Sequence, residues 1–288
     1  MTGEYGMVDE DAVEIPGDEW EEIDVADTEA DRIARRRDRE FNQFRKRIKD
    51  SDQFKVEASV FDDATYAALY RLVQHGAIAA LGGPLSTGKE ANVYAALGGE
   101  AADAEEVAVK VYRISASDFR DMREYLVGDP RFEELGGKQK VVLAWTNKEF
   151  ANLERARKAG VRVPRPIDVE RNVLVMEFIG TEGERAKRLA EVRIENPETA
   201  YGVLREYIRR LYDAGLVHGD LSEFNVLFHE GQLVVIDVGQ AVTIHHPNSR
   251  EFLERDCENV ASFFSRQGLD VTGDELLAYV EENADPFQ

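Results

Sequence analysis

Three oxygen-bearing side chains in the last third of the sequence have the types and spacing that phosphoryl transfer requires. Asp220 is followed five residues later by Asn225, and Asp237 comes twelve residues after Asn225, at the end of an apolar run. Phosphoryl transfer needs a carboxylate near the attacking hydroxyl and oxygen ligands for a Mg²⁺ ion that bridges the phosphates. Asp220 is the candidate catalytic carboxylate, and Asn225 and Asp237 are the candidate metal ligands.

Lys110 is a candidate for binding the phosphates of a nucleotide. In the segment 107–112, valines at 107, 109 and 111 point to one face of a predicted strand, and Lys110 points to the other. A lysine placed in this way can hold the α and β phosphates, as in protein kinases. Taken alone, Lys110 fits a solvated strand lysine better, but the glycine-containing loop 22 residues upstream favours phosphate binding.

Glu149 lies in a helix predicted from Trp145 to Ala159. In kinases a carboxylate on such a helix pairs with the strand lysine and orients it. The alternative is a capping box, in which Thr146 and Glu149 satisfy backbone groups at the start of their own helix. We favour an ion pair between Glu149 and Lys110.

The segment from Gly83 to Glu90 nearly matches a Walker A loop, but Glu90 stands where a hydroxyl would bind Mg²⁺. The segment that follows is short and favours a strand, whereas a Walker A loop is followed by a helix. We therefore expect a loop between two antiparallel strands, in which Ser86, Thr87 and Gly88 let backbone amides approach phosphate. An ordinary hairpin turn is the alternative.

Hydrophobic periodicity predicts the elements that position these residues. Near the middle of the chain, a long polar segment from 114 to 140 separates the lysine strand from the next helix. The expected elements are a helix at 62–80, strands at 91–96 and 105–113, strand-like residues at 161–180, helices at about 184–215, a hairpin around Gly231, a strand at 233–239 and two C-terminal helices.

The charge distribution is uneven. The 288 residues carry a net charge of −21, and residues 1–30 hold twelve acidic residues without lysine or arginine. This predicts a disordered acidic tail and argues against a general nucleic-acid binder. Residues 31–50 hold nine basic and four acidic residues, which predicts a basic helix that is either solvated or in contact with RNA.

Other classes of protein are excluded by composition. Cys257 is the single cysteine and cannot form an internal disulfide, and the five histidines have no zinc-ligand spacing beside it. No apolar run is long enough to cross a bilayer, and the acidic N-terminus is unlike a signal peptide. We expect a cytoplasmic protein without a membrane partner. Only ten of the 36 basic residues are lysine, and this acid-rich, lysine-poor composition suggests a high-salt cytoplasm.

Together these motifs resemble the type-one branch of the RIO family of atypical protein kinases, in an archaeal and halophilic form. The segments 86–94, 218–225 and 236–239 carry the resemblance, which spans about 55–275. It implies a two-lobed α+β kinase fold with a mainly antiparallel N-lobe and an α-helical C-lobe. It also implies ATP and Mg²⁺, with Mn²⁺ as an alternative metal, and serine/threonine kinase activity with autophosphorylation or ATPase turnover. The implied role is small ribosomal subunit maturation, with the precursor particle, its RNA and its proteins, as partner.

The resemblance also assigns residues and boundaries. Residues 176–179 are the implied hinge, and Asp237 matches a position that can carry a transient phosphate. The implied nucleotide-binding residues are Ser86, Thr87, Gly88, Lys89, Glu90, Val93, Lys110, Glu177 and Ile179. The expected organisation is the tail at 1–30, the basic helix at 31–50, an N-lobe at 51–179 with a mobile loop near 114–140, and a C-lobe at 180–288.

Two features depart from ordinary protein kinases. Gly219 stands where an arginine would read a phosphorylated activation loop, and only 51 residues follow Asp237. A full activation segment and the peptide-binding helices are therefore expected to be absent. Asp256 is expected to be a cap or a support of the catalytic loop.

Two other functions share part of this pattern. Small-molecule phosphotransferases, such as aminoglycoside and choline kinases, also use the segment His-Gly-Asp with a later asparagine, but they lack the loop at 86–90. A ribosome-assembly module that uses ATP as a conformational switch would need the same metal and phosphate ligands, so the sequence alone does not separate it from a kinase.

Overall fold

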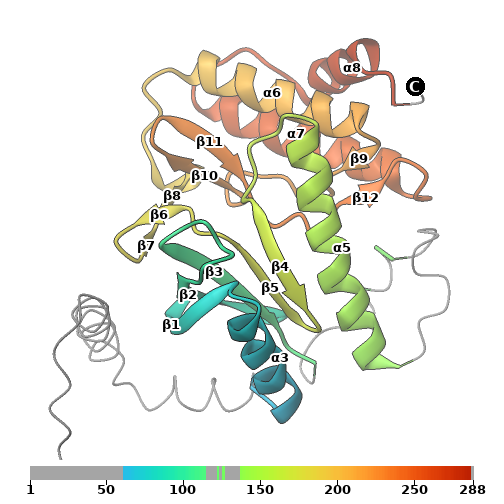
Figure 1. Ribbon diagram of the computed structural model, residues 1–288. Helices are drawn as coiled ribbons and strands as arrows, with labels where there is room; N and C mark the ends of the chain where they lie inside the picture. The colour runs from blue at the N-terminus through green and yellow to red at the C-terminus, as the bar shows by residue number, and fades with distance from the viewer. Residues whose placement is uncertain (1–60, 115–121, 123–124, 127–136, 287–288) are drawn as a thin grey trace, which may run out of the picture. The chain divides into compact units, whose positions relative to one another are not determined.

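The computed structural model describes residues 61–114, 122, 125–126 and 137–286 (Figure 1). The predicted acidic tail at 1–30 and the basic helix at 31–50 lie outside the described residues. Within the described part of the chain, no helix is both long enough and apolar enough to span a membrane.

A five-stranded antiparallel sheet forms the N-lobe, with its strands in the order β1-β2-β3-β5-β4. The predicted alternation in β3 is confirmed, because Val107, Val109 and Val111 are buried in one hydrophobic cluster with Leu72 of α3, while Lys110 lines a cavity. The strands are β1 (Ile78–Thr87), β2 (Ala91–Gly98), β3 (Glu106–Tyr112), β4 (Pro166–Glu170) and β5 (Val173–Glu177).

The helix predicted at 62–80 is too long. Helix α3 spans Asp63–Gln74, and the Asp62 side chain caps its start by accepting from the backbone N–H of Thr65 at 2.7 Å. The helix ends before Gly76, whose φ of +74° breaks the helical geometry, and Ile78 already pairs with β2. The residues after the glycine are apolar like those of the helix, but Ile78, Ala79 and Ala80 belong to strand β1, and Ile78 is buried there.

Helix α5 (Lys138–Lys158) begins seven residues before the predicted start at Trp145. Its first turns bury Val141, Val142 and Trp145, in a cluster that also contains Met122 and Leu126. The loop predicted near 114–140 therefore ends before Lys138, and two of its residues, Met122 and Leu126, are buried. The start of α5 was predicted too late because its first three residues are polar and its buried residues begin only at Val141.

The C-lobe combines short strands with three helices, and its hydrophobic core also includes Leu153 and Ala156 of α5 and Leu174 of β5. In Figure 1, α6, α7 and α8 lie together in this lobe. The elements are β6 (Gly180–Thr181), β7 (Glu184–Arg185), β8 (Lys187–Arg188), the 3-10 turn η2 (Leu189–Glu191), α6 (Pro197–Asp213), β9 (Leu216–Val217), β10 (Val226–His229), β11 (Gln232–Val235), β12 (Val242–Thr243), α7 (Ser249–Arg266) and α8 (Gly273–Asn283).

Helices were predicted from about 184, and this is wrong before residue 197. Residues 184–191 form short strands and a 3-10 turn, because Arg188 pairs with Leu227 of β10 and extends the β10–β11 hairpin into a three-stranded sheet. The helix starts only where Asn196 caps it and Pro197 occupies its first turn. The hairpin around Gly231 and the two C-terminal helices are confirmed.

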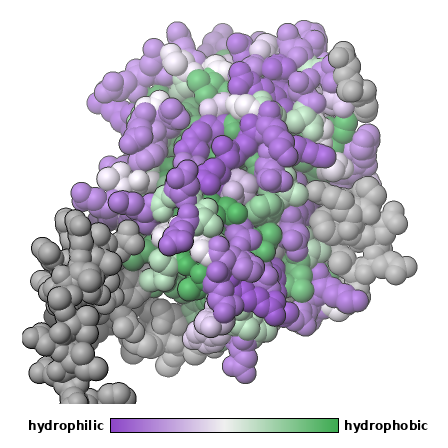
Figure 2. Space-filling model, viewed as in Figure 1, coloured by the Kyte–Doolittle hydropathy of each residue, from purple (hydrophilic) through white to green (hydrophobic). Residues whose placement is uncertain are grey.

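The two separate cores agree with the predicted two-lobed α+β fold. The N-lobe core lies between α3 and the five-stranded sheet, and the C-lobe core gathers around α6 and α7. Hydrophilic residues cover most of the face shown in Figure 2, with smaller hydrophobic areas between them. Cys257 is buried, as predicted.

Candidate active site

A cavity of about 510 Å³ is lined by residues of both lobes, and this volume is in the range of small-molecule sites. Residues of the β1–β2 hairpin, β3, α5 and the segment after β5 contribute to the lining, as do residues of β8, β10 and the end of β11. The predicted residues that line it are Ser86, Gly88, Lys89, Glu90, Val93, Lys110, Glu149, Glu177, Ile179, Asn225 and Asp237. Thr87 and Asp220 are not among the lining residues.

Lys110 connects the N-lobe sheet to a helix and to the C-lobe. Its Nζ donates to Glu149 Oε1 and to Asp237 Oδ1, each at 2.7 Å. The predicted ion pair with Glu149 is therefore present, and Glu149 also accepts from the buried Tyr112 hydroxyl. The two carboxylates lie 39 and 127 positions from Lys110 in the sequence, yet both converge on its ammonium.

The alternative for Glu149, a capping box with Thr146, is wrong. Because α5 starts at Lys138, both residues lie inside the helix. The Thr146 hydroxyl donates to the carbonyl of Val142 at 2.8 Å, which is a contact within one helical turn. Glu149 is free of any capping role and its carboxylate faces β3.

The charges of Lys110 and Asp237 stabilise each other. Burial disfavours the ammonium, but Asp237 and Glu149 raise the pKa of Lys110 well above its usual value. In return, the Lys110 ammonium lowers the pKa of Asp237. The Asp237 side chain is 56% exposed, so its ionised carboxylate remains accessible for a metal ion.

Asp237 has a left-handed backbone, with a φ of +63°. This conformation is costly for a residue other than glycine, and such strain is often found at functional sites. The preceding residue, Ile236, donates its N–H to the carbonyl of Asn225 at 2.9 Å. The end of β11 is thus tied to the start of β10, which brings the two candidate metal ligands close together.

Asn225 connects the metal ligands to Asp220. Its amide NH₂ donates to the Asp220 carbonyl at 2.7 Å and to Asp220 Oδ2 at 3.1 Å. Because the NH₂ group makes these contacts, the amide oxygen of Asn225 is its remaining side-chain atom for a metal ion. Asp220 is exposed beside the cavity, where an acceptor hydroxyl can reach it.

Asp256 of α7 supports the loop that carries Asp220, as the sequence predicted. Its buried carboxylate accepts from the N–H of Gly219 at 2.8 Å and from the N–H of Leu221 at 2.7 Å, on either side of Asp220. Gly219 has a φ of +83°, which favours glycine at this position. Burial raises the pKa of Asp256 to about 6, although His218 and the two N–H groups act in the opposite direction.

We expect a rise in pH to weaken the folded state through Asp256. The pKa of this carboxyl is about 6 in the fold and about 3.8 ordinarily, so the folded protein holds the proton more tightly. The resulting stabilisation is complete below pH 4 and is lost as the pH rises through 6. The difference in unfolding free energy between the wild type and Asp256→Asn should fall by about 2 kcal/mol from pH 4 to 7. Denaturant titrations at several pH values measure this difference, and a flat profile would contradict the assignment.

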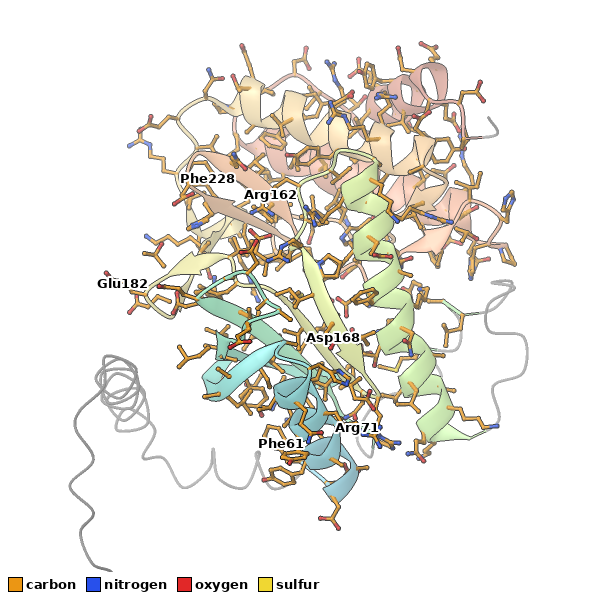
Figure 3. The ribbon with its side chains drawn as sticks, in the orientation of Figure 1. Phe61, Arg71, Arg162, Asp168, Glu182 and Phe228 are labelled. Carbon is orange, nitrogen blue, oxygen red and sulfur yellow. The ribbon has the colours of Figure 1, made fainter. Side chains whose placement is uncertain are left out.

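The implied hinge residues, 176–179, line the cavity. The Glu177 side chain is already hydrogen-bonded to two arginines. Its carboxylate accepts from Arg162 at 2.6 and 2.8 Å and from the N–H of Arg165 at 2.9 Å. Arg162, the partner of Glu177, is labelled in Figure 3. The Ile179 carbonyl accepts from the N–H of Ala186 at 2.8 Å.

The predicted connection between two antiparallel strands is confirmed, but it is shorter than predicted, because residues 83–87 belong to β1 and only residues 88–90 form the turn to β2. A Walker A loop is excluded, since a strand follows in place of a helix. The Gly88 N–H donates to the Ala91 carbonyl at 3.0 Å and to Asn92 Oδ1 at 3.4 Å, so this amide is used within the turn. Ser86 and Lys89 are exposed near the tip and line the cavity.

Sequence reasoning missed several residues of the cavity. Tyr112 shares the strand face of Lys110, so the alternation could have identified it. Arg185 and Arg188 come from a segment that was predicted to be helical, and nothing in their pattern indicated the cavity. Lys148 and Asn152 contact the turn after Asp237, and no sequence motif identifies either residue.

Comparisons with known proteins agree with one another. The sequence model of the RIO domain matches residues 92–276. The RIO-type serine/threonine-protein kinase Rio1 of Haloferax volcanii is 68% identical, over 97% of this chain and 96% of that protein. Serine/threonine-protein kinase RIO1 is 40% identical in Caenorhabditis elegans, over 83% of this chain, and 37% identical in Homo sapiens, over 91%. This chain matches about half the length of those two proteins, at 48% and 47%.

Solved structures give the same fold. The Rio2 kinase of Chaetomium thermophilum superposes with a TM-score of 0.58 at 24% identity, over 77% of this chain and 70% of that one. An ADP/Mg²⁺-phosphoaspartate complex of the same kinase has a TM-score of 0.57 at 24% identity, over 77% of this chain and 68% of that one. At this identity the likeness establishes the two-lobed fold.

Proposed function

This chain belongs to the RIO family of atypical serine/threonine protein kinases, and we propose that its cavity binds ATP with Mg²⁺ and transfers the γ-phosphoryl group to a serine or threonine hydroxyl. The observation that carries the proposal is the convergence of Glu149 and Asp237 on Lys110 at 2.7 Å. A phosphate-binding cation, its orienting carboxylate and a metal-binding carboxylate are the groups that this reaction requires.

Each side chain has a distinct role in this reaction. The ammonium of Lys110 binds the α and β phosphates, and Glu149 keeps it oriented. Asp237 and the amide oxygen of Asn225 would hold Mg²⁺, which neutralises the phosphate charge when bound. Mn²⁺ is an alternative metal for the same oxygens. Asp220 accepts the proton of the attacking hydroxyl from a position just outside the cavity.

The remaining cavity residues would bind the rest of the nucleotide. Adenine would lie between Val93 and the hinge, with the Glu177 carbonyl and the Ile179 N–H as hydrogen-bond partners. We propose a boundary between the lobes at Ile179, with the N-lobe at 51–179 and the C-lobe at 180–288. The Rio2 complex with ADP and Mg²⁺ contains a phosphoaspartate, and Asp237 is the candidate for a similar transient phosphate in this chain.

The acceptor is proposed to include the protein itself. Ser115 and Ser117 follow the lysine strand closely, in a segment of the chain outside the described residues. After incubation with ATP and Mg²⁺, phosphate should be found at these serines. Mass mapping of tryptic peptides checks this, and phosphate confined to residues 1–60 would refute it.

A role as an ATP-driven assembly switch is supported by one observation. Only eleven residues, 238–248, separate Asp237 from α7, so the segment that binds peptide substrates in ordinary kinases has no room here. We propose the precursor of the small ribosomal subunit as the cytoplasmic partner, with the basic residues of 32–49 in contact with its RNA.

ATP turnover measured with and without small-subunit particles tests the proposed function and separates the two roles. A kinase transfers labelled phosphate to protein and does so without particles. A switch forms ADP mainly when particles are present and labels little protein. If neither ADP nor labelled protein is formed under any of these conditions, the proposed function is wrong.

A further inference from the structure

The turn after β11 is held by two side chains of α5. Asn152 uses both hydrogens of its amide, which donate to the carbonyls of Val238 and Ala241, each at 3.0 Å. Lys148 donates from Nζ to the carbonyl of Gly239 at 2.9 Å. Three carbonyls of one turn are therefore bound by side chains 86 to 91 residues away in the sequence.

Both side chains are buried, so these contacts are not incidental surface bonds. Lys148 and Asn152 are each 1% exposed, and the Lys148 ammonium lies 4.8 Å from the centre of the Trp145 ring. Burying an ammonium or an amide is costly unless its hydrogen bonds are made. The turn carbonyls supply these bonds, which ties the position of the turn to the position of the helix.

The turn is also in close contact with the helix through Gly239. A Cβ atom at this position would lie 2.9 Å from Trp145 Nε1 and 3.1 Å from the Tyr112 hydroxyl. A larger residue at position 239 would therefore require the Trp145 ring, the Tyr112 hydroxyl or the turn itself to move. A glycine fits this position because it leaves room for these two side chains.

One face of α5 determines the geometry of both halves of the site. Glu149, which orients Lys110, lies between Lys148 and Asn152 along the helix, and residues three and four positions apart share a helical face. The strained Asp237, with its φ of +63°, begins the turn that the other two residues hold. Strain of this kind persists only where surrounding contacts fix the backbone.

We propose that Lys148 and Asn152 are positioning residues that lock the Asp237 turn onto α5, so that the metal site is assembled without an activation segment. This inference rests on the proposed function, since it concerns how the same site holds Mg²⁺. In ordinary kinases an activation segment and its phosphorylation control the corresponding helix and metal-binding turn. Here three hydrogen bonds from α5 to the turn take over this role.

Binding measurements on the full chain test the proposal with Asn152→Leu and Lys148→Met, which keep most of the side-chain volume and remove the donors. Titrating Mg²⁺ in the presence of a non-hydrolysable ATP analogue should show a loss of metal affinity of roughly ten- to a hundredfold, as for other residues that orient metal ligands. Adenosine affinity should remain close to that of the wild type, because adenine contacts the hinge.

Matched controls come from the same helix. Asn147→Leu and Lys158→Met change exposed residues that do not contact the turn, since the Asn147 amide donates to the Leu143 carbonyl of its own helix. Both variants should bind Mg²⁺ and adenosine as the wild type does. Hydrogen exchange at residues 238–241 should accelerate in the two test variants and stay unchanged in the controls.

The outcomes separate this proposal from the proposed function. If the wild type shows no Mg²⁺-dependent nucleotide binding, the proposed function itself fails. If the wild type binds and both test variants retain its Mg²⁺ affinity, the positioning role is overturned. An equal loss of adenosine and Mg²⁺ affinity would also overturn it, because the residues would then only support the cavity. If Asn152→Leu does not fold, Lys148→Met decides alone, because it removes the hydrogen bond to the Gly239 carbonyl and should lower Mg²⁺ affinity without lowering adenosine affinity.

Discussion

Asp237→Asn is expected to abolish the Mg²⁺-dependent transfer of phosphate from ATP. The substitution removes the negative charge and replaces one of the two carboxylate oxygens by an NH₂ group, which does not bind Mg²⁺. It also weakens the contact between Lys110 Nζ and Asp237 Oδ1, which is 2.7 Å long. Both the metal and the phosphate-binding cation lose a partner in a single change.

Initial rates with γ-labelled ATP measure this effect. We expect a loss of at least roughly three orders of magnitude, the scale of removing a group that stabilises the charge of the transferring phosphate. Asp270→Asn is the matched control, because Asp270 is exposed in the loop between α7 and α8. Turnover near the wild-type rate in Asp237→Asn would contradict the assignment of the metal ligand.

Asp220→Ala is expected to slow phosphoryl transfer by roughly two orders of magnitude or more, the range of a positioned acid–base group. ATP affinity should remain nearly intact, because Asp220 lies outside the lining of the cavity. The rate constant and the nucleotide affinity must therefore be measured separately, by single-turnover kinetics and by equilibrium binding.

Asp220→Asn distinguishes the proton-accepting role from a structural one. The asparagine keeps an oxygen that can accept from the Asn225 amide, which now donates to Asp220 Oδ2 at 3.1 Å. We expect the metal geometry to be preserved and the rate to fall as in Asp220→Ala. If nucleotide affinity collapses in either variant, Asp220 supports the loop and does not act on the hydroxyl.

Groups with a local motif were predictable from the sequence. Asp220, Asn225 and Asp237 lie within 18 positions of one another, and their spacing is set by one loop and one hairpin. Lys110 was predictable from strand alternation, and its pairing with Glu149 followed from the chemistry of the site. Hydrogen bonds confirm that Lys110 meets Glu149 and Asp237, and that Asn225 meets Asp220.

Elements whose formation depends on distant partners were predicted less well. Residues 184–188 contain helix-forming arginine, alanine and lysine, yet Arg188 pairs with Leu227 in a sheet that the local pattern does not show. The start of α5 was missed because three polar residues precede its buried face. Lys148 and Asn152 look like ordinary helix residues, and only the folded turn at 238–241 reveals their function.

ADP formation in a single turnover is the most direct test of whether Lys110, Glu149 and Asp237 form one phosphoryl-transfer site. The full wild-type chain is mixed with limiting labelled ATP, either with Mg²⁺ or with a chelator, and the products are separated. We expect ADP to appear with Mg²⁺, with the lost phosphate on protein or in solution, and no ADP with the chelator or in Asp237→Asn. Absence of ADP from the folded wild type at saturating Mg²⁺, or equal amounts with the chelator, would contradict the assignment.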